Sequence, residues 1–502
     1  MSEVKRRELF PGVWLRAVHT NQFKSAYLSV TLMAPLDGGT AAENALIPSV
    51  LRRGTRTHPD MESMSAALDE LYGGAVEPVV RKKGETQCVG LVASFLDDAY
   101  TLEGEPILES AAALLGQVLL DPCTEEGIFR ADYVAGEQAN LLDRIRGQIN
   151  DKRVYASHRL AQVMCREEAF GVDKLGDEES AGAITPGSLW QRYQALLNTA
   201  AVEVYYSGSA QSERVEAALR SALSALPVNP NRVVPDCEVR LTAGTKPQIV
   251  EEALDVTQGK LAMGFRTGGV TCWEEDYPAM VLCNAVFGGT TLSKLFMNVR
   301  EKLSLCYYAS SVLEKMKGLV LVSSGIEFDK YETARDEILA QLDQIRRGEI
   351  EDWELEGARR TVIGGYRATL DDQGRQEEFW LGQTAAGLET DIPQLVEQIQ
   401  RLILSGAYPP GSKLPSVREL AAQAAVNPNT MQKALAELET DGLLFTQRTA
   451  GRFVTEDGEA IQQLRRQLCQ GILENFIQSM TGLGFTPQQA LEQLQFHVEG
   501  RN

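Results

Sequence analysis

The chain passes twice through a similar order of strand-like and helical segments. In each pass, runs rich in β-branched and aromatic residues alternate with longer stretches of helical periodicity. The strand-like runs of the first pass are VWLRAVHT, AYLSVTLMAP, VEPVVRKKGETQCVGLVAS and a closing VEVYYSGS. Those of the second pass are IVEEALDVTQGKLAMGFRTG, from about residue 248, and GLVLVSSGIEF. Two passes of comparable size predict an internal duplication of an α+β unit.

Helices and a linker complete this two-part plan. We expect a helix over residues 42–52, helices up to about 200, a helix over 277–287 and further helices to about 389. The prolines and asparagines of 229–235 predict the linker between the two parts. The second pass has no counterpart of the closing run VEVYYSGS. A missing strand would leave an unpaired sheet edge, which predicts pairing with a partner or aggregation.

Length and charge limit the classes to which the protein can belong. Its 502 residues suggest about three domains of about 150 residues each. The net charge of -20 argues against nonspecific binding of nucleic acid or anionic lipid over the whole surface. No apolar run approaches the ~20 residues that span a membrane, and the N-terminus lacks the apolar core of a signal peptide. We therefore expect a cytoplasmic protein that does not contact a membrane.

Cysteine and histidine usage gives no indication of a cofactor. The eight cysteines are scattered without a CxxC pair, which is typical of reduced thiols in a cytosolic protein. His19, His58, His158 and His497 are far apart, and no two have the spacing of a local metal motif. We expect no bound cofactor and no histidine-rich zinc site.

Beyond about residue 391, short capped helices and a small hairpin replace the long strands. Ser416 and Glu419 fit a capping box at the start of one helix. Gly442 stands where a C-cap glycine would end the helix over 427–441. FTQR and RFVT flank Thr449-Ala450-Gly451, which predicts a tight hairpin.

A last helical stretch begins at about residue 459. Its apolar stripe consists of Ile461, Leu464, Leu468, Ile472, Phe476 and Met480. Thr486 then fits the cap of a short final helix.

The helix over 427–441 has two different sides. Asn427 can cap it, and Pro428 can open its first turn. One side carries Met431, Ala434, Leu435 and Leu438, and the other begins with Asn429, Thr430, Gln432 and Lys433. Such a helix can pack by its apolar side and use the tip of the other side for recognition.

Residues 391–457 closely resemble a GntR-type winged helix-turn-helix. The motifs are ILSGAYPPGSKLPSVREL, the PNT helix entry, the LE-x-x-GLL helix exit and GRFV. The tail is similar to that of the YtrA-like branch, which dimerises through short helices. The resemblance implies a double-stranded DNA operator, read in the major groove by the N-terminal end of the 427–441 helix.

The DNA-binding residues that we expect are Arg418, Asn427, Asn429, Thr430, Gln432, Lys433, Arg448 and Arg452. Asn and Gln can pair with adenine, and Lys can reach guanine or phosphate. Arg418 can contact phosphate or a base, and Arg448 and Arg452 bracket the hairpin tip, where they can reach a backbone or a minor groove. Residues 401–454 contain six basic and four acidic side chains, a difference of +2. Glu437, Glu439 and Asp441 are expected at the far end of the helix, away from the groove.

Residues 459–480 are expected to form a homodimer interface. Intramolecular packing of the same apolar stripe is the alternative.

The first 390 residues resemble a pitrilysin/insulinase-type metallopeptidase, and more narrowly its noncatalytic subunits. The matching stretches are ALIPSVLRRGT, GEQANLL and LFMNVREKLSLCYY. Active relatives carry HxxEH, in which two histidines hold zinc and the glutamate activates water. Here Ala45, Pro48 and Ser49 stand at these positions, and Glu137 matches a downstream glutamate ligand. The resemblance therefore implies no metal and no hydrolysis.

Arg300 and Tyr307 match a pair that holds substrate in active relatives. The resemblance implies a residual clamp that would act with a catalytic peptidase-like partner chain. The alternative is that Arg300 pairs with a carboxylate and that Tyr307 packs in the sheet. The peptidase-like part also ends about a strand and a helix short, which either a natural fusion or an error of gene prediction or assembly would explain.

Together these observations predict a two-lobed α+β peptidase-like region, each lobe a mainly antiparallel sheet with helices, followed by a winged helix-turn-helix and a helical tail. The expected boundaries are 1–230, 231–390, 391–457 and 458–502. The leading functional hypothesis is a dimeric, sequence-specific transcriptional regulator with an inactive peptidase-like region. The alternative is a noncatalytic subunit of a peptidase-like heterodimer, in which the DNA-binding segment is incidental.

Overall fold

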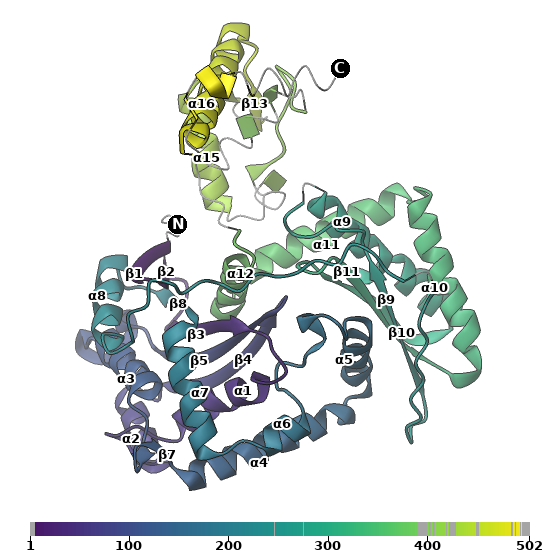
Figure 1. The fold of residues 1–502 in the computed structure, drawn as a ribbon. Helices are drawn as coiled ribbons and strands as arrows, with labels where there is room; N and C mark the ends of the chain where they lie inside the picture. Colours follow the sequence, from purple (N-terminus) through teal and green to yellow (C-terminus); the bar gives the residue numbers. More distant parts are fainter. Residues whose placement is uncertain are drawn as a thin grey trace. The chain divides into compact units, whose positions relative to one another are not determined.

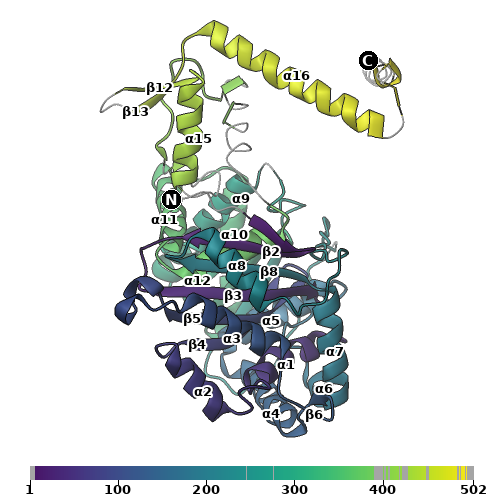
Figure 2. The same cartoon turned by 90° about the vertical axis from the view of Figure 1, so that its left-hand side faces the viewer.

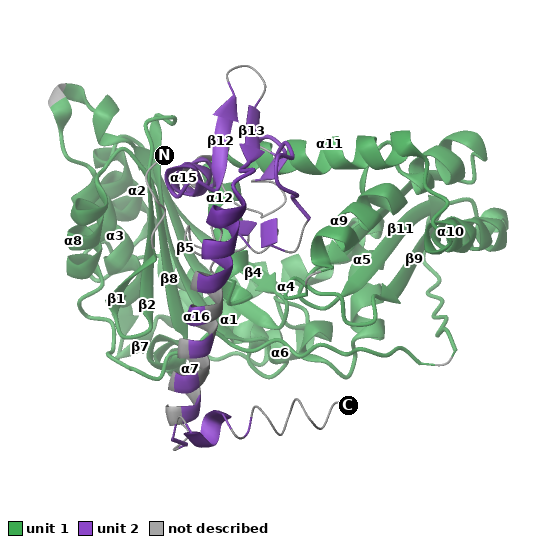
Figure 3. Ribbon diagram, turned by 90° about the horizontal axis from the view of Figure 1, so that it is seen from above, with its two compact units in different colours: residues 1–389 green, residues 390–502 purple. Residues whose placement is uncertain are grey.

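The computed structural model forms two compact units, Met1–Glu389 and Thr390–Asn502 (Figure 3). It describes residues 6–244, 246–274, 276–388, 399–400, 403–404, 407–417, 419–420, 428–447, 451–482, 485–486, 488–491 and 493. Of the helices in these ranges, none combines the length and the apolar character needed to cross a membrane.

The first module, residues 6–226, is built on a six-stranded sheet of order β1-β2-β8-β3-β5-β4 (Figure 1). Its strands are β1 (Arg6–Phe10), β2 (Val13–His19), β3 (Ser25–Pro35), β4 (Ala75–Lys83), β5 (Thr86–Leu96) and β8 (Ala201–Gly208). All neighbours are antiparallel except β2 and β8, which run parallel. The closing strand β8 thus lies between β2 and β3, although it comes last along the chain.

One face of this sheet holds the main core of the first unit. Alternate residues of β3 point into it, and Leu28, Val30 and Leu32 are 0%, 0% and 1% exposed. The helices of the module are α1 (Ala41–Arg52), α2 (Met61–Glu70), α3 (Leu108–Leu120), α4 (Ala131–Gly147), α5 (Lys152–Met164), α6 (Glu178–Gly182), α7 (Pro186–Thr199) and α8 (Ser212–Ala222). Helices α1, α3 and α7 cover the core face, and the short β6 (Thr124–Glu125) and β7 (Ile128–Phe129) pair beside them.

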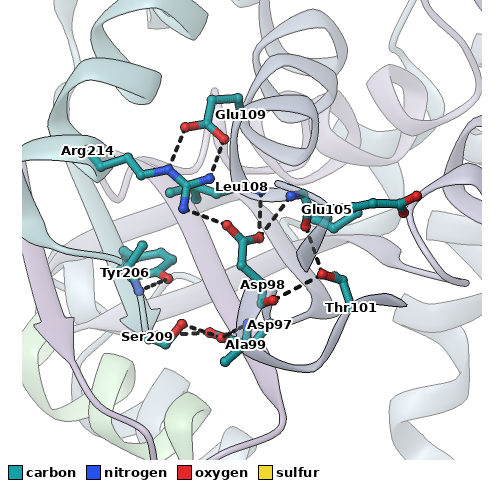
Figure 4. Close-up of polar contacts among 12 residues, drawn as sticks. Asp97, Asp98, Ala99, Thr101, Glu105, Leu108, Glu109, Tyr206, Ser209 and Arg214 are labelled. Carbon is teal, nitrogen blue, oxygen red and sulfur yellow. Dashed lines mark hydrogen bonds and ion pairs between the residues drawn. The ribbon is translucent and has the colours of Figure 1, made fainter. Parts of the chain in front are cut away.

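A polar network fastens the end of β8 and helix α8 to the end of β5 and to helix α3 (Figure 4). Asp97, directly after β5, accepts hydrogen bonds from the backbone amide and the hydroxyl of Ser209, directly after β8. The next residue, Asp98, accepts from the first amides of α3 and pairs with Arg214 of α8 at 2.6 Å. Arg214 also forms a bidentate pair with Glu109 of α3. The closing strand and its helix are therefore held by charge as well as by packing.

The second module, residues 259–388, has a three-stranded antiparallel sheet of order β10-β11-β9. The strands are β9 (Gly259–Arg266), β10 (Cys306–Glu314) and β11 (Leu319–Ile326). The helices are α9 (Tyr277–Asn284), two π-helical segments η5 (Ala285–Gly289) and η6 (Leu295–Lys302), α10 (Tyr331–Arg346), α11 (Asp352–Thr369) and α12 (Gln373–Ala385). Phe287, Leu295, Val299, Val320, Val322 and Ile338 form the core on one face of this sheet.

Each module contributes one helix to the sheet of the other (Figure 1). Helix α5 of the first module packs on β9 and β11, where a Cβ added at Gly264 would lie 2.4 Å from the sulfur of Met164. Helix α12 of the second module packs on β3 and β8. Its Glu377 accepts a hydrogen bond from Ser29 and pairs with Arg81 at 2.5 Å. This exchange makes the two modules one compact unit.

The turns β4–β5 and β10–β11 meet at a buried ion cluster. Lys317, which is 0% exposed, contacts carboxylate oxygens of Glu85 at 2.6 Å and Glu168 at 2.9 Å. Glu168 also pairs with Arg266 of β9. Burial alone would raise the pKa of Glu168, but hydrogen bonds from Arg266 and Lys317 outweigh it and hold the pKa below its ordinary value.

The structure confirms most of the expected elements in this unit. The runs VWLRAVHT, AYLSVTLMAP, VEVYYSGS and GLVLVSSGIEF lie in strands, and residues 41–52 and 277–284 are helical. The prediction of a strand from about residue 248 was wrong up to residue 258, because only Gly259–Arg266 of that run is a strand. In the first module the corresponding strand β2 pairs with β8, and no described strand of the second module takes that place.

Candidate nucleic-acid interface

Helix α15, Pro428–Thr440, presents its apolar side to a small core of the second unit. Met431, Ala434, Leu435 and Leu438 are all buried, as the sequence predicted. The core also includes Ile399, Ile403, Leu414, Leu420, Leu443, Leu444, Val454 and Leu464. Gln432 lies between the buried positions and is exposed. The helix is thus fixed by one face while another faces solvent.

Local hydrogen bonds define the helix ends as expected. The amide of Glu419 donates to the hydroxyl of Ser416 at 3.3 Å, and the amide of Ser416 donates to the Glu419 carboxylate at 2.7 Å. Gly442 has a φ of 73°, and its amide and that of Leu443 bond back to Glu439 and Leu438. This pair of bonds is a Schellman motif, which explains why glycine follows α15.

A hairpin follows α15 directly. Its strands β12 (Leu444–Gln447) and β13 (Gly451–Val454) are antiparallel, and Phe445 stacks on Phe453 with ring centroids 5.7 Å apart. The segment at Ser412–Leu414 bonds to the other side of β13 through Leu414 N to Arg452 O and Val454 N to Ser412 O. The hairpin predicted from FTQR and RFVT is present, and this third, short segment was not predicted.

Arg452 of the hairpin is tied to α15. Its Nε donates to a carboxylate oxygen of Glu439 at 3.0 Å, and its Nη1 donates to the side-chain oxygen of Gln432 at 3.2 Å. The hydroxyl of Thr446, and then Arg452, hold the pKa of Glu439 below its ordinary value. Arg452, expected to reach DNA, therefore contacts two side chains of the helix in this structure.

Glu439 was expected only at the far end of the helix, and its contact with Arg452 was not predicted. It lies seven residues after Gln432 on the same helix, so both side chains stand on one face two turns apart. That spacing, together with an arginine in the hairpin that follows, is the sequence signal that could have predicted the contacts of Arg452 with both side chains.

The other expected DNA contacts are only partly described. Arg418, Asn427 and Arg448 lie outside the described residues. Asn429, Thr430 and Lys433 belong to the first turns of α15, and the structure describes only the backbone of these three residues. Of the eight residues, the structure thus brings Gln432 and Arg452 together, and DNA contact by all eight stays a prediction.

Helix α16, Gly458–Gly482, contains the apolar stripe predicted as a dimer interface (Figure 2). Leu464 is buried in the core around α15, and Ile461 and Met480 are half-buried. Leu468, Ile472 and Phe476 have no described side chains. The first part of the stripe therefore packs within the unit, as the alternative interpretation proposed.

The positions expected to replace a zinc motif lie on α1. Ala45 and Pro48 are buried, and Ser49 is half-buried. Glu137 of α4 pairs with Arg53, one residue beyond the end of α1, at 3.3 Å. Within the described part of the chain, no three His, Cys, Asp or Glu side chains gather where they could hold a metal ion. The carboxylate near this helix is therefore balanced by an arginine.

Arg300 and Tyr307 lie on neighbouring elements of the second module. Arg300, on η6, stacks on Phe296 and lies 3.5 Å from a carboxylate oxygen of Glu301. Tyr307 occupies a bulge at the start of β10 and is 53% exposed. Tyr307 therefore does not pack in the sheet. Arg300 has a carboxylate neighbour, as the alternative interpretation of this pair expected.

Two stretches of the chain match models of known protein families. Residues 183–362 match the peptidase M16 inactive domain. Residues 392–454 match the bacterial regulatory proteins of the gntR family.

Known proteins match the two parts of the chain separately. The chain is 32% identical over 404 residues to the probable inactive metalloprotease YmfF of Bacillus subtilis, which covers 80% of this chain and 94% of that protein. Its C-terminal part is 39% identical over 87 residues to the transcriptional repressor YtrA of the same organism, 16% of this chain and 67% of that protein. A solved structure of a conserved protein from Enterococcus faecalis superposes with a TM-score of 0.68 at 25% identity, covering 87% of this chain and 96% of that one.

Proposed function

Because the chain belongs to the inactive M16 metalloprotease family and carries a gntR-family domain at its C-terminus, we propose that it is a sequence-specific DNA-binding transcriptional regulator. It binds a double-stranded operator in the cytoplasm as a homodimer through α16. Its two α/β modules are the lobes of a peptidase scaffold without zinc chemistry, and the hairpin β12–β13 serves as the wing.

One observation carries this proposal. Helix α15 buries one face completely and leaves Gln432 exposed, with its side-chain oxygen held by Arg452. A fixed helix with an oriented amide near its N-terminal end suits base reading in the major groove, where glutamine pairs bidentately with adenine. A solvated face without a reading role would not need the amide to be held.

Within this proposal the eight residues have different roles. Asn429, Thr430, Gln432 and Lys433 read base edges, and Asn427 begins the helix beside the DNA. Arg418 and Arg448 contact the phosphate backbone, which positions the protein without specifying sequence. Arg452 acts as a positioning residue, because it joins Gln432 to Glu439.

The test is binding of the full-length protein to the DNA upstream of its own gene, measured by fluorescence anisotropy at several salt concentrations. The logarithm of the affinity should fall linearly with the logarithm of the salt concentration, because bound cations are released from the phosphates. Arg418→Ala should weaken binding to all sequences and lower that slope by about one for each protomer.

The control is Arg346→Ala, which removes an exposed arginine of α10 in the other unit. This variant should bind like the wild type. If no duplex binds at low ionic strength, the proposal is wrong.

A second function, as a noncatalytic subunit of a peptidase-like heterodimer, is favoured by the match to YmfF along four fifths of the chain. In that case Arg300 and Tyr307 would contact substrate held by the partner chain. The two functions are distinguished by the same titration, because a pure subunit would form a stoichiometric complex with a peptidase-like chain and would ignore the operator.

Zinc hydrolysis is outside both proposals, since Ala45 and Pro48 offer no ligand and no base. Metal analysis of the purified protein should find no stoichiometric zinc.

A further inference from the structure

The second sheet corresponds to one half of the first. In the first module, β3 pairs with β5 on one side and β8 on the other. In the second module, β9 occupies the place of β3 and pairs with β11, the counterpart of β5. No described residue pairs with the outer side of β9. Within the part of the chain that the structure describes, the position that β8 fills in the first module is therefore open in the second.

Chain length explains this difference. The first module uses Pro186–Thr199, Ala201–Gly208 and Ser212–Ala222 for α7, β8 and α8. In the second module α12 ends at Ala385, and the gntR-family match begins at residue 392. Only residues 386–391 lie between them, too few for a helix, a strand and a second helix.

The apolar side chains near this open position are incompletely covered. Leu28, Val30 and Leu32 of β3 are fully buried, whereas every residue of β9, including Leu261, is only half-buried. Phe328 lies just after β11, near the start of β9, and is 62% exposed. The apolar side chains of β9 are therefore less covered than those of β3, as expected of a strand with one neighbour.

The segment before β9, residues 248–258, also lacks a strand with which to pair. In the first module β2 is the other neighbour of β8. Its counterpart in the second module, residues 248–258, has no strand, and Ile249 and Val250 are exposed. Glu252 accepts hydrogen bonds from Arg159 and Tyr155 of α5, so this segment is held away from the role of an edge strand.

The polar contacts that hold β8 and α8 in the first module have no counterpart among the described residues of the second. Asp97 and Asp98 after β5 hold Ser209 and Arg214 of the closing unit (Figure 4). At the same place after β11, Glu327 is exposed and pairs with Lys330 three residues on. An exposed carboxylate, paired with Lys330, thus lies at the end of the open edge.

The direction of the free amides follows from the ladder. The amide of Thr267 donates to the carbonyl of Gly318, and the β9–β11 register continues from this pair. In an antiparallel ladder hydrogen-bonded pairs alternate with pairs whose amides point outward. The backbone groups of Lys260, Ala262, Gly264 and Arg266 therefore point to the open edge.

We propose that the outer edge of β9 binds an extended apolar strand, followed by a helix, from a different polypeptide chain. This chain supplies what α8 and β8 supply in the first module: a strand antiparallel to β9 and a helix beside α10, where Leu339 is 37% exposed. Main-chain hydrogen bonds give affinity, and alternate apolar side chains give specificity. The proposal is independent of DNA binding.

A second copy of this chain is a poorer occupant. Within the described residues its strands already belong to sheets, and its unpaired segment 248–258 is fastened to α5. A separate chain with a free strand–helix unit needs no such release.

The test uses the full-length protein and a fluorescein-labelled peptide of residues 200–222, the β8–α8 unit, as the probe. Binding should be saturable. Ala262→Pro removes an outward amide without removing a ladder bond, because proline is tolerated on an edge strand when its nitrogen faces solvent. It should weaken binding at least about tenfold, equivalent to about 1.4 kcal/mol.

Ala262→Ser retains the amide at nearly the same volume and should bind like the wild type. Lys260→Pro, which removes another outward amide at the start of the strand, replaces Ala262→Pro if that variant does not fold. Absence of saturable binding, or equal binding by the proline variant, overturns the proposal. A concentration-dependent dimer of the wild type that Ala262→Pro dissociates overturns it in favour of a second copy.

Discussion

Gln432 combines exposure with a fixed orientation, which is unusual for a surface amide. Its neighbours Met431, Ala434 and Leu435 are buried, and its oxygen accepts a hydrogen bond from Arg452. Rotation of the side chain is therefore restricted before DNA is bound, so less conformational entropy is lost on binding.

Replacement of this amide should change specificity more than affinity. Gln432→Ala should relax the preference at one base position by about 1–3 kcal/mol and leave the other positions unchanged. The measurement is a set of affinities for operators that each differ by one base pair. Gln463→Ala, which changes an exposed glutamine of α16, should leave the set unchanged. A uniform loss across all operators would show that Gln432 does not read a base.

Glu439 should influence the same base position without touching DNA. Glu439→Gln removes the charge that holds Arg452, so Gln432 gains freedom and discrimination at its position should fall. The exposed neighbour Glu437 gives a matched control, Glu437→Gln. Because the Glu439–Arg452 pair is partly exposed, the stability cost should remain under about 1 kcal/mol. Equal discrimination by both variants would remove the positioning role of Arg452.

At the scale of elements, α15 shows how local signals end a helix. Gly442 has a left-handed backbone, and no heavy atom lies within 4 Å of a Cβ added there. Gly442→Ala should therefore destabilise residues 390–502 through backbone strain alone, by about 1 kcal/mol. Gly458→Ala, at the start of α16 and without a positive φ, is the control and should not destabilise.

Hydrogen exchange of the α15 amides measures both variants in the full-length protein. Faster exchange in Gly458→Ala than in Gly442→Ala would contradict the assignment of the Schellman motif.

The element scale also shows where periodicity fails. Residues 248–258 carry the composition of a strand, but a strand needs a neighbour for its amides and carbonyls. β2 has β8 as this neighbour, whereas no described strand of the second module is a counterpart of β8. The missing closing strand stays a prediction, and residues 248–258, the counterpart of its other neighbour, form no strand.

At the scale of the whole molecule, the ion cluster around Lys317 joins the two modules. Lys317→Met should destabilise the first unit by about 3–5 kcal/mol, because Glu85 and Glu168 would stay buried without a cation. Lys330→Met removes a partly exposed pair with Glu327 and should cost about 0–1 kcal/mol. All five tryptophans lie before residue 390, so urea unfolding followed by tryptophan fluorescence reports on this unit.

The same cluster gives the first unit an acid limit. The pKa of Glu168 is lower in the folded state than its ordinary value of 4.5. Its contribution to stability is therefore complete above that pH and is lost as the pH falls through the folded value. Urea midpoints should decline below about pH 4.5, and less steeply in Glu168→Gln. An equally steep decline in that variant would assign the acid sensitivity to other carboxylates.

The sequence by itself determined the features that depend on neighbours within about ten residues. The capping box at Ser416, the glycine after α15, the buried face of that helix and most strands of the first unit are of this kind, because each is stabilised by local hydrogen bonds or by one periodic face.

Tertiary structure alone decided which distant segments meet. The exchange of α5 and α12, the position of β8 between β2 and β3, the cluster at Lys317 and the link from Arg452 to Gln432 join residues that no local pattern relates. Their physical reason is shared. A buried strand edge or charge must find a partner somewhere in the molecule, and only the folded arrangement shows which partner is within reach.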